Sequence, residues 1–332
     1  MSKTMDFKLP TVLQNSEGKI RTVGFELEFG GADLDTTAQC IIDLYGGKRV
    51  IHNKFLQEVA ETELGKFSLK MDALMLTEKS YEKTLEKFGI DIKDKSVEEM
   101  MESVASIVVP YEVGAPPIPM TQVHRIDELR KALHHKQAEG THFSIFNAYA
   151  THINPELPAL NAETILRYIK AFLLLYPAIH SRAELAIRRR LSSYINPFPE
   201  GYISLVLNEN YAPDFDTLLV DYHIYNPDRN RPLDIYPAFA FIDKSKTDAL
   251  PDIGNVKPRP TFHYRLPNCE IDSPEWSLAI DWNEWVAVEN LANSVNEELN
   301  ILCREYLDQK AETTFGFNNK WIKKTEYLLD KI

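Results

Sequence analysis

The sequence of 332 residues predicts a single α+β domain built on one sheet. Short segments in which apolar and polar residues alternate, as is typical of strands, recur between longer segments with helical spacing. Hydrophobic residues make up 44% of the chain and charged residues 26%, which are ordinary values for a globular protein. The sequence contains no repeat and no low-complexity linker, so one domain is the simpler interpretation.

The clearest strand is the stretch at residues 21–30. Its apolar side chains lie on one side, whereas Glu26 and Glu28 lie on the other, about 7 Å apart along the strand. Two carboxylates at that distance repel each other, so each favours protonation or a shared cation. Carboxylate oxygens suit Mg²⁺ completed by water and nucleotide phosphate. A half-exposed strand face that is acidic without any function is the alternative.

The other elements are expected in the following order. Helices are predicted at residues 33–45, 77–101, 123–138, 161–180, 184–191, 199–207, 215–225 and 274–307. Strands or extended segments are predicted at residues 49–52, 55–60, 66–71, 107–113, 140–155 and 258–265. Residues 114–119 are rich in proline and are not expected to continue a ladder. Residues 225–234 have the composition of a turn, and an amphipathic tail ends the chain.

Four of these strands carry a polar pair at positions i and i+2, which places both side chains on one strand face. The pairs are Glu26/Glu28, Lys70/Asp72, His152/Asn154 and His263/Arg265, and a fifth strand presents Glu112. If the strands share a sheet, one face is apolar and packs on helices, and the other is a concave polar floor. That floor would offer carboxylates to Mg²⁺ and guanidinium groups to phosphate. Each residue alone also has an ordinary interpretation as a hydrogen-bonded or ion-paired surface group.

Several classes of function are disfavoured by the composition. The net charge of −12 argues against nucleic-acid binding, which needs a cationic surface. The longest apolar run, at residues 171–179, is interrupted by Pro177 and is too short to span a bilayer. The odd number of widely spaced cysteines indicates a reducing compartment. We therefore expect a cytoplasmic protein without membrane or nucleic-acid partners. The sequence contains no phosphate loop, so nucleotide chemistry would depend on metal-binding carboxylates.

Five segments, in this order, resemble the amidoligase family of carboxylate–amine ligases, which has a glutamine synthetase-type fold. They are VGFELE at residues 23–28, PYEVGAPP at 110–117, THINPE at 151–156, YNPDRNRPLD at 225–234 and PRPTFHYRLPN at 258–268. The resemblance extends from about residue 21 to 307. It implies an antiparallel sheet whose polar concave face cups the active site, with ATP and two or more Mg²⁺ ions bound there. It also implies ATP-dependent joining of a carboxylate to an amine through an acyl phosphate.

The resemblance also implies roles for individual residues. Glu26, Glu28 and Glu112 would bind metal; Arg265, Arg231 and His152 would be catalytic; Asn154, Arg190 and His263 would bind the cofactor. Asp72 is a further candidate. His142 competes with His152, which we prefer because Asn-Pro-Glu follows it.

The expected organisation is an N-terminal extension at residues 1–20, a catalytic domain at 21–310 and a helical tail at 311–332. The expected substrates are small-molecule or peptide carboxylates and amines, and a glutamine- or γ-glutamyl-hydrolysing enzyme is a candidate partner. A guanidino kinase-like phosphotransferase and a non-catalytic ATP sensor are the alternatives. The residues identify neither the two substrates nor the oligomeric state.

Overall fold

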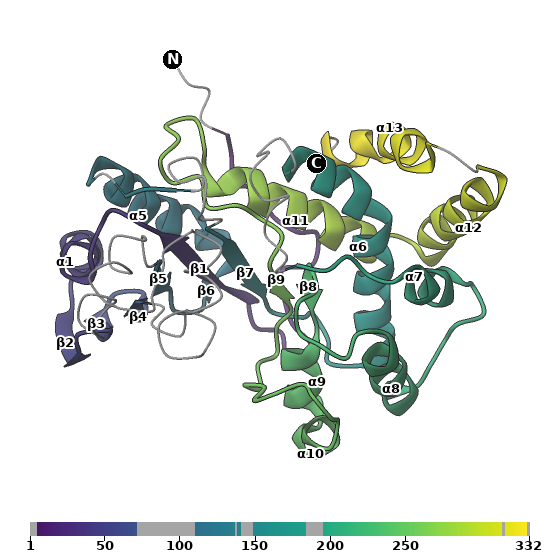
Figure 1. Cartoon of the computed structure of the whole chain (residues 1–332), viewed down its shortest axis with the longest axis horizontal. Coiled ribbons are helices and arrows are strands. Elements are labelled where there is room, and N and C mark those ends of the chain that lie inside the picture. The colour runs from purple at the N-terminus through teal and green to yellow at the C-terminus, as the bar shows by residue number, and fades with distance from the viewer. Residues whose placement is uncertain are drawn as a thin grey trace, which may run out of the picture.

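The fold is organised around one antiparallel sheet, seen in the computed structural model in Figure 1. The structure describes residues 5–71, 110–136, 138–140, 149–183, 195–313 and 316–330. Within these ranges nine strands pair in the order β2-β3-β4-β5-β1-β7-β9-β8, and β6 pairs with β1. The strands are β1 (Thr22–Phe29), β2 (Lys48–Asn53), β3 (Leu56–Thr62), β4 (Gly65–Met71), β5 (Tyr111–Gly114), β6 (Ile118–Pro119), β7 (Thr151–Pro155), β8 (Leu233–Asp234) and β9 (His263–Tyr264). The predicted α+β class and the antiparallel sheet are confirmed.

Helices pack beside this sheet and continue beyond its β8 end (Figure 1). In the described residues they are α1 (Leu34–Tyr45), the short 3₁₀ helix η1 (Met120–Gln122), α5 (His124–His135), α6 (Ala162–Ala183), α7 (Glu200–Leu207), α8 (Phe215–Tyr225), α9 (Tyr236–Ile242), α10 (Lys244–Asp248), α11 (Leu278–Ala292), α12 (Asn296–Glu312) and α13 (Phe317–Asp330). None of these helices is long and apolar enough to cross a membrane.

Strand β1 separates a buried side from a polar side. Its apolar side chains, Val23, Phe25, Leu27 and Phe29, are all at most 1% exposed, whereas the residues between them are partly exposed. The Phe25 ring packs against Trp282 of α11, with ring centroids 6.3 Å apart. Burial of such side chains contributes about 1.5–3 kcal/mol each, so a slip of one residue in the register would be strongly unfavourable.

A buried polar network joins β1 to the helices. The guanidinium of Arg21 donates to both carboxylate oxygens of Glu289 on α11, at 2.8 and 2.7 Å. Tyr168 on α6 and Trp285 on α11 donate to the same carboxylate at 2.6 and 2.9 Å. Because each of these charges is buried and paired, the network fixes where β1 lies relative to α6 and α11.

Helix α1 illustrates how sequence signals set the ends of an element. The Asp33 side chain accepts a hydrogen bond from the Thr36 backbone N–H at 2.7 Å and so caps the first turn. The helix ends at Gly46, which has a φ of 68° that favours glycine. The predicted helix at residues 33–45 is therefore confirmed.

The single helix predicted at residues 274–307 is wrong, because two helices occupy this region. Helix α11 ends at Ala292, and α12 begins at Asn296. The Asn293 side chain donates to the Glu289 carbonyl, and the Ser294 hydroxyl donates to the Leu291 carbonyl, each at 2.8 Å. The Leu291 carbonyl, which a continuing helix would offer to the Val295 N–H, accepts instead from the Ser294 hydroxyl and from the Ser294 N–H. No glycine or proline marks the break in the sequence.

Three other expectations differ from the structure. Residues 114–119 were not expected to pair, but Ile118 and Pro119 of β6 pair with Val23 and Thr22. This pairing is only two residues long, so it does not need a donor from every residue. The strand predicted at residues 258–265 is reduced to the two residues of β9. Helices α9 and α10 were not predicted. The helices predicted at 77–101 and 184–191 lie outside the described residues.

Both ends of the described chain pack on the body of the protein. The Lys8 N–H donates to Asn283 of α11, and the Lys8 carbonyl accepts from the Trp282 indole at 2.7 Å. In α13, the Trp321 indole donates to the Leu174 carbonyl of α6 at 2.8 Å. The predicted boundaries at residues 20 and 310 stay predictions.

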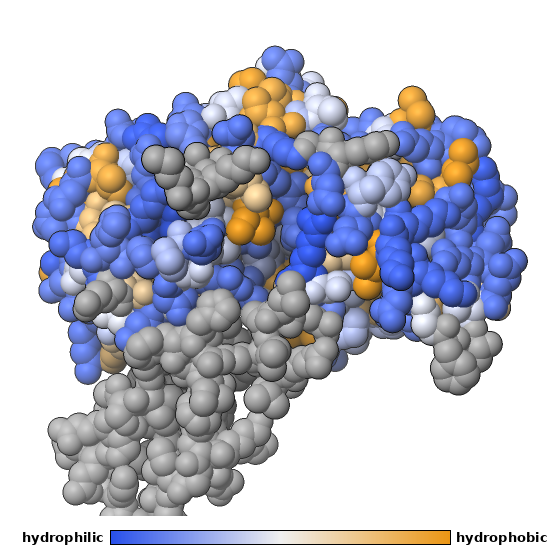
Figure 2. Space-filling model, turned by 90° about the horizontal axis from the view of Figure 1, so that it is seen from above, coloured by the Kyte–Doolittle hydropathy of each residue, from blue (hydrophilic) through white to orange (hydrophobic). Residues whose placement is uncertain are grey.

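The face seen in Figure 2 is mostly hydrophilic, and its hydrophobic residues form small separate groups. The most exposed large hydrophobic residues of the described chain include Val295 at 71% and Ile224 at 65%. Single exposed side chains of this kind are normal and do not indicate a docking surface.

Candidate functional site

The strand register brings the predicted polar residues together on one side of the sheet. Glu26 of β1 lies opposite His152 of β7, and Glu28 lies opposite Glu112 of β5. Glu112 in turn lies opposite Lys70 of β4. Directly opposed residues in antiparallel strands point to the same face with Cβ atoms about 5 Å apart. The prediction that these strands share one sheet is therefore confirmed for the described residues.

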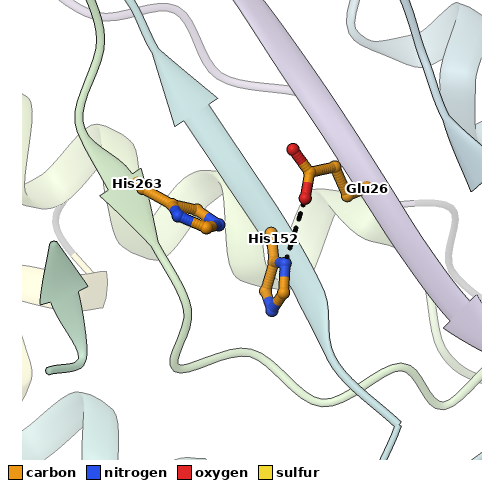
Figure 3. Close-up of side chains that lie close together, drawn as sticks. All are labelled: Glu26, His152 and His263. Carbon is orange, nitrogen blue, oxygen red and sulfur yellow. Dashed lines mark hydrogen bonds and ion pairs between the residues drawn. The ribbon is translucent and has the colours of Figure 1, made fainter. Parts of the chain in front are cut away.

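Glu26 of β1 points toward His152 of β7 on this polar face (Figure 3). One carboxylate oxygen lies 3.3 Å from His152 Nδ1, and the other accepts from Asn154 Nδ2 at 3.2 Å and Arg259 Nη1 at 3.3 Å. Burial alone would raise the pKa of Glu26. The His152 hydrogen bond opposes burial, as do the charge of Arg259 and the charges that His263 and His152 carry when protonated in acid, and the pKa of Glu26 falls well below its usual range. Glu26 is therefore a carboxylate at neutral pH.

His263 presents an imidazole beside this carboxylate. Its ring meets the His152 ring edge-on, with centroids 4.8 Å apart and an interplanar angle of 84°. Burial lowers the pKa of His263 to about 4, and the charge of Arg265 acts in the same direction. His263 is thus neutral at pH 7. Its Nδ1 lies 3.9 Å from Asp234 Oδ2, whereas its buried Nε2 has no hydrogen-bond partner.

Asp234 anchors two arginines behind His263. Its carboxylate is fully buried and accepts from Arg229 Nε at 2.9 Å and from Arg265 Nη2 at 3.0 Å. Burial would raise the pKa of Asp234, but the contact with His263 and the two guanidinium charges lower it to about 2. Asp234 therefore stays ionised and holds Arg265 next to His263.

Glu28 and Glu112 form the second acidic part of the face. Glu28 Oε2 accepts from the Ala150 backbone N–H at 2.9 Å, and Oε1 lies 3.9 Å from His152 Nε2. Glu112 Oε1 lies 2.7 Å from Lys70 Nζ. Like charges directly opposite one another on neighbouring strands are destabilising, and a cation placed between them would relieve the repulsion.

Arg231 is placed differently from the other predicted residues. Its guanidinium donates to the backbone carbonyls of Pro197 at 2.9 Å, Tyr225 at 3.3 Å and Asn196 at 3.4 Å. The side chain thus links two loop segments, and its role toward phosphate stays a prediction. Asp72, His142 and Arg190 lie outside the described residues.

Sequence reasoning missed Asp234, Arg229 and Arg259 as site residues. All three occur in the segments at residues 225–234 and 258–268 that carry the family resemblance. Arg259 stands four residues before His263, so no i, i+2 pattern singles it out. Asp234 is recognisable only through its partners, because nothing in the sequence distinguishes it from other turn aspartates.

The donor atoms on this face fit divalent metal ions. Among the described residues, Glu26, His152 and His263 form a group whose ligand atoms all lie within 4.8 Å of one another. Glu28 and Glu112 add carboxylate oxygens, which Mg²⁺ prefers, whereas imidazole nitrogens suit transition metals better. The buried Nε2 of His263 is an orphaned ligand atom that a bound metal would satisfy, with Asp234 as the outer carboxylate that orients the ring.

Comparison with known proteins adds one finding. A family model described as "Putative amidoligase enzyme" matches residues 19–287, which is more than three quarters of the chain. No curated protein and no solved structure matches. The matched range includes every residue of the polar face described above.

Proposed function

Because the chain belongs to the amidoligase family, a family of ligase-type enzymes, we propose that it is an ATP- and Mg²⁺-dependent ligase. It joins a carboxylate to an amine and forms an amide through an acyl phosphate. The likeness of its sheet to that of glutamine synthetase belongs to the same proposal.

The observation that carries the proposal is the convergence of Glu26, Glu28 and Glu112 on one face of neighbouring strands. A purely structural sheet face gains nothing from three acids of which two stand directly opposite each other. A face that receives a metal-bound triphosphate needs carboxylate oxygens as ligands for the ions. The arginines beside it supply the opposite charge for phosphate oxygens.

The proposal assigns the following roles to individual residues. Glu26, Glu28 and Glu112 would hold the ions, and the Nε2 of His263 would be a further ligand for one of them. Arg265 and Arg229, kept in place by Asp234, face the phosphate groups, and Arg259 does so from the rim with 44% of its side chain exposed. When bound, Mg²⁺ supplies charge neutralisation for the triphosphate. The positioning of the substrates and the fixed positive charge of the arginines then account for most of the rate acceleration.

The reaction balances in two steps. An oxygen of the substrate carboxylate attacks the γ-phosphorus, the bond to the bridging oxygen breaks and ADP leaves. The amine nitrogen then attacks the acyl carbon, inorganic phosphate leaves with its pair of electrons and the nitrogen loses a proton. The acyl phosphate has to be kept from water between the two steps.

Hydroxylamine tests the proposal without knowledge of the amine, since it is a strong nucleophile that traps an acyl phosphate as a hydroxamate. The protein, MgATP and hydroxylamine are incubated with a panel of amino acids and dicarboxylic acids. We expect a hydroxamate from at least one acid, with an equal amount of ADP. Both should disappear in Glu28→Gln and persist in the control Glu297→Gln, which removes an exposed carboxylate on α12.

Two outcomes would contradict the proposal. ADP formed together with an acid-labile phosphoguanidine, and no hydroxamate, would identify a guanidino kinase. MgATP binding without ADP production across the panel would identify a nucleotide sensor.

A further inference from the structure

A cavity of about 130 Å³ lies where the end of α6 meets the beginning of α11 and the segment that follows β9. Tyr264 lines it, and Tyr264 packs on Trp285 of α11 with ring centroids 5.5 Å apart. Tyr264 follows His263 on β9, so the two side chains point to opposite faces of the sheet. The cavity therefore lies on the side of β9 that is opposite to His263.

Acidic groups dominate the lining of this cavity. Glu270, Asp281 and Glu284 contribute three carboxyl groups, and Arg182 contributes the one basic side chain among the lining residues. Arg182 Nη1 lies 3.9 Å from Glu284, and its Nη2 is 2.6 Å from Asp330, outside the cavity. Its charge is thus shared between two carboxylates. Burial raises the pKa of Glu284 to about 7, and the Arg182 charge only partly opposes this.

Besides the acidic lining, the side chain of Asn268 is a second feature that indicates a ligand in the cavity. Its side chain lines the cavity, only 5% of the residue is exposed and its Nδ2 donates to the Ala183 carbonyl at 3.4 Å. Its Oδ1 is buried without a hydrogen-bond partner. A buried acceptor left in this state costs about 1–3 kcal/mol, which a donor in the cavity would recover.

We propose that this cavity binds a small organic ammonium ion, the protonated form of a primary amine. An ammonium group has three donors, and Asn268 Oδ1, Glu284 and Asp281 provide acceptors for it, although Asp281 Oδ2 also accepts from the Trp276 indole at 3.2 Å. Ile179, Leu266, Ile280 and Trp276 provide an apolar wall for the attached carbon chain. The volume suits roughly six heavy atoms, since a cavity of about 150 Å³ holds benzene.

A bare metal ion fits this cavity less well. Among the residues that the structure describes, no three metal-binding atoms of the cavity acids lie within 4.8 Å of one another, in contrast to Glu26, His152 and His263. The acids are too widely spaced for one ion but suit a larger cation with an apolar tail. Because the cavity is on the side of β9 that is opposite to His263, this amine site is distinct from the proposed reaction site.

Isothermal titration of the full chain with n-butylammonium chloride tests the proposal, in a phosphate buffer that contains no amine. We expect saturable binding, and no binding of n-butanol, sodium butyrate or potassium chloride at the same ionic strength. Glu284→Gln keeps the size of the side chain and should weaken binding at least tenfold, as should Asn268→Leu. The control Glu275→Gln removes an exposed carboxylate next to Trp276 and should leave binding unchanged.

Three results with the wild-type protein and the Glu284→Gln variant would overturn the inference. These are no saturable binding of n-butylammonium, equal binding of n-butanol, and full binding in a folded Glu284→Gln variant. A fourth variant, Glu26→Gln, distinguishes this site from the proposed reaction site. It should lose hydroxamate formation and keep amine binding, whereas loss of amine binding in Glu26→Gln would place the amine on the polar face.

Discussion

Glu284 gives the protein a stability that depends on pH, and the Glu284→Gln variant should remove this dependence. The side chain is 10% exposed, and the charge of Arg182, 3.9 Å away and shared with Asp330, is its one counter-charge among the residues that the structure describes. Burial raises its pKa from 4.5 to about 7. The difference corresponds to roughly 3 kcal/mol in the free energy of unfolding, at about 1.36 kcal/mol per pKa unit.

The sign of the effect follows from the raised pKa. The folded state holds the Glu284 proton more tightly than the unfolded state, so the contribution is fully present below pH 4.5. It is lost as the pH rises from 4.5 through 7, because the unfolded chain ionises first. Glutamine stays neutral throughout. Relative to wild type, we therefore expect Glu284→Gln to gain roughly 3 kcal/mol at pH 8 and under about 1 kcal/mol at pH 5.

Thermal and urea unfolding of both proteins at pH 5, 6, 7 and 8 measure this difference. An unfolding entropy near 2.1 cal/mol/K per residue gives roughly 0.7 kcal/mol/K for the chain, so the gain at pH 8 is a Tm increase of about 4 °C. Groups other than Glu284 cancel in the comparison, and Glu275→Gln serves as the exposed control. Stability curves for wild type and Glu284→Gln that stay parallel across this pH range would refute the reasoning.

Three further predictions concern the polar face and the core. Glu26→Gln and Glu28→Gln should each abolish ATP consumption. Each should change Tm by less than about 5 °C, because neither side chain packs in the core. If either variant unfolds at a much lower temperature, these acids stabilise the fold and the site assignment is wrong. MgATP at a hundred times its Kd should raise Tm by roughly 4 °C, and ATP with EDTA should not. Equal Tm shifts with and without EDTA would show that nucleotide binding does not depend on a metal. Glu289→Gln breaks the buried pair with Arg21 and should cost about 3–5 kcal/mol, while the Kd for MgATP stays within twofold; a proportional loss of affinity would instead place this pair in the site.

Much of the sheet could be predicted because its strands carry local signals. In β1, strict alternation defines both the strand and its polar face, since every second side chain is forced to the same side. The pair His152/Asn154 on β7 follows the same rule, and so does His263 of β9 with Arg265 directly after it, so their convergence required only that the strands share a sheet. The ends of α1 could likewise be predicted from the sequence, because Asp33 caps its first turn and Gly46 ends its last turn, both through the adjacent backbone.

The rest depends on contacts between residues far apart in the sequence. Asp234 becomes an anchor only when β8 and β9 pair and bring Arg265 to it, 31 residues away. The end of α11 is set by Asn293 and Ser294, and by Arg167 of α6, whose Nε donates to the Ala292 carbonyl at 2.7 Å. Glu284 looks like a solvated helix residue in the sequence, and only the packing of α6 and the segment after β9 buries it. Local patterns therefore predict strand faces well, but not buried charges.

Transfer of ¹⁸O from the substrate carboxylate tests the central claim, formation of an acyl phosphate, most directly. An acid that gives a hydroxamate is labelled in both carboxylate oxygens and incubated with the protein, MgATP and an amine. The inorganic phosphate is then analysed by mass spectrometry. The account predicts one ¹⁸O atom in each phosphate released, because a carboxylate oxygen forms the bond to phosphorus and leaves with it. Phosphate without ¹⁸O, with both labelled oxygens still on the acid, would contradict it.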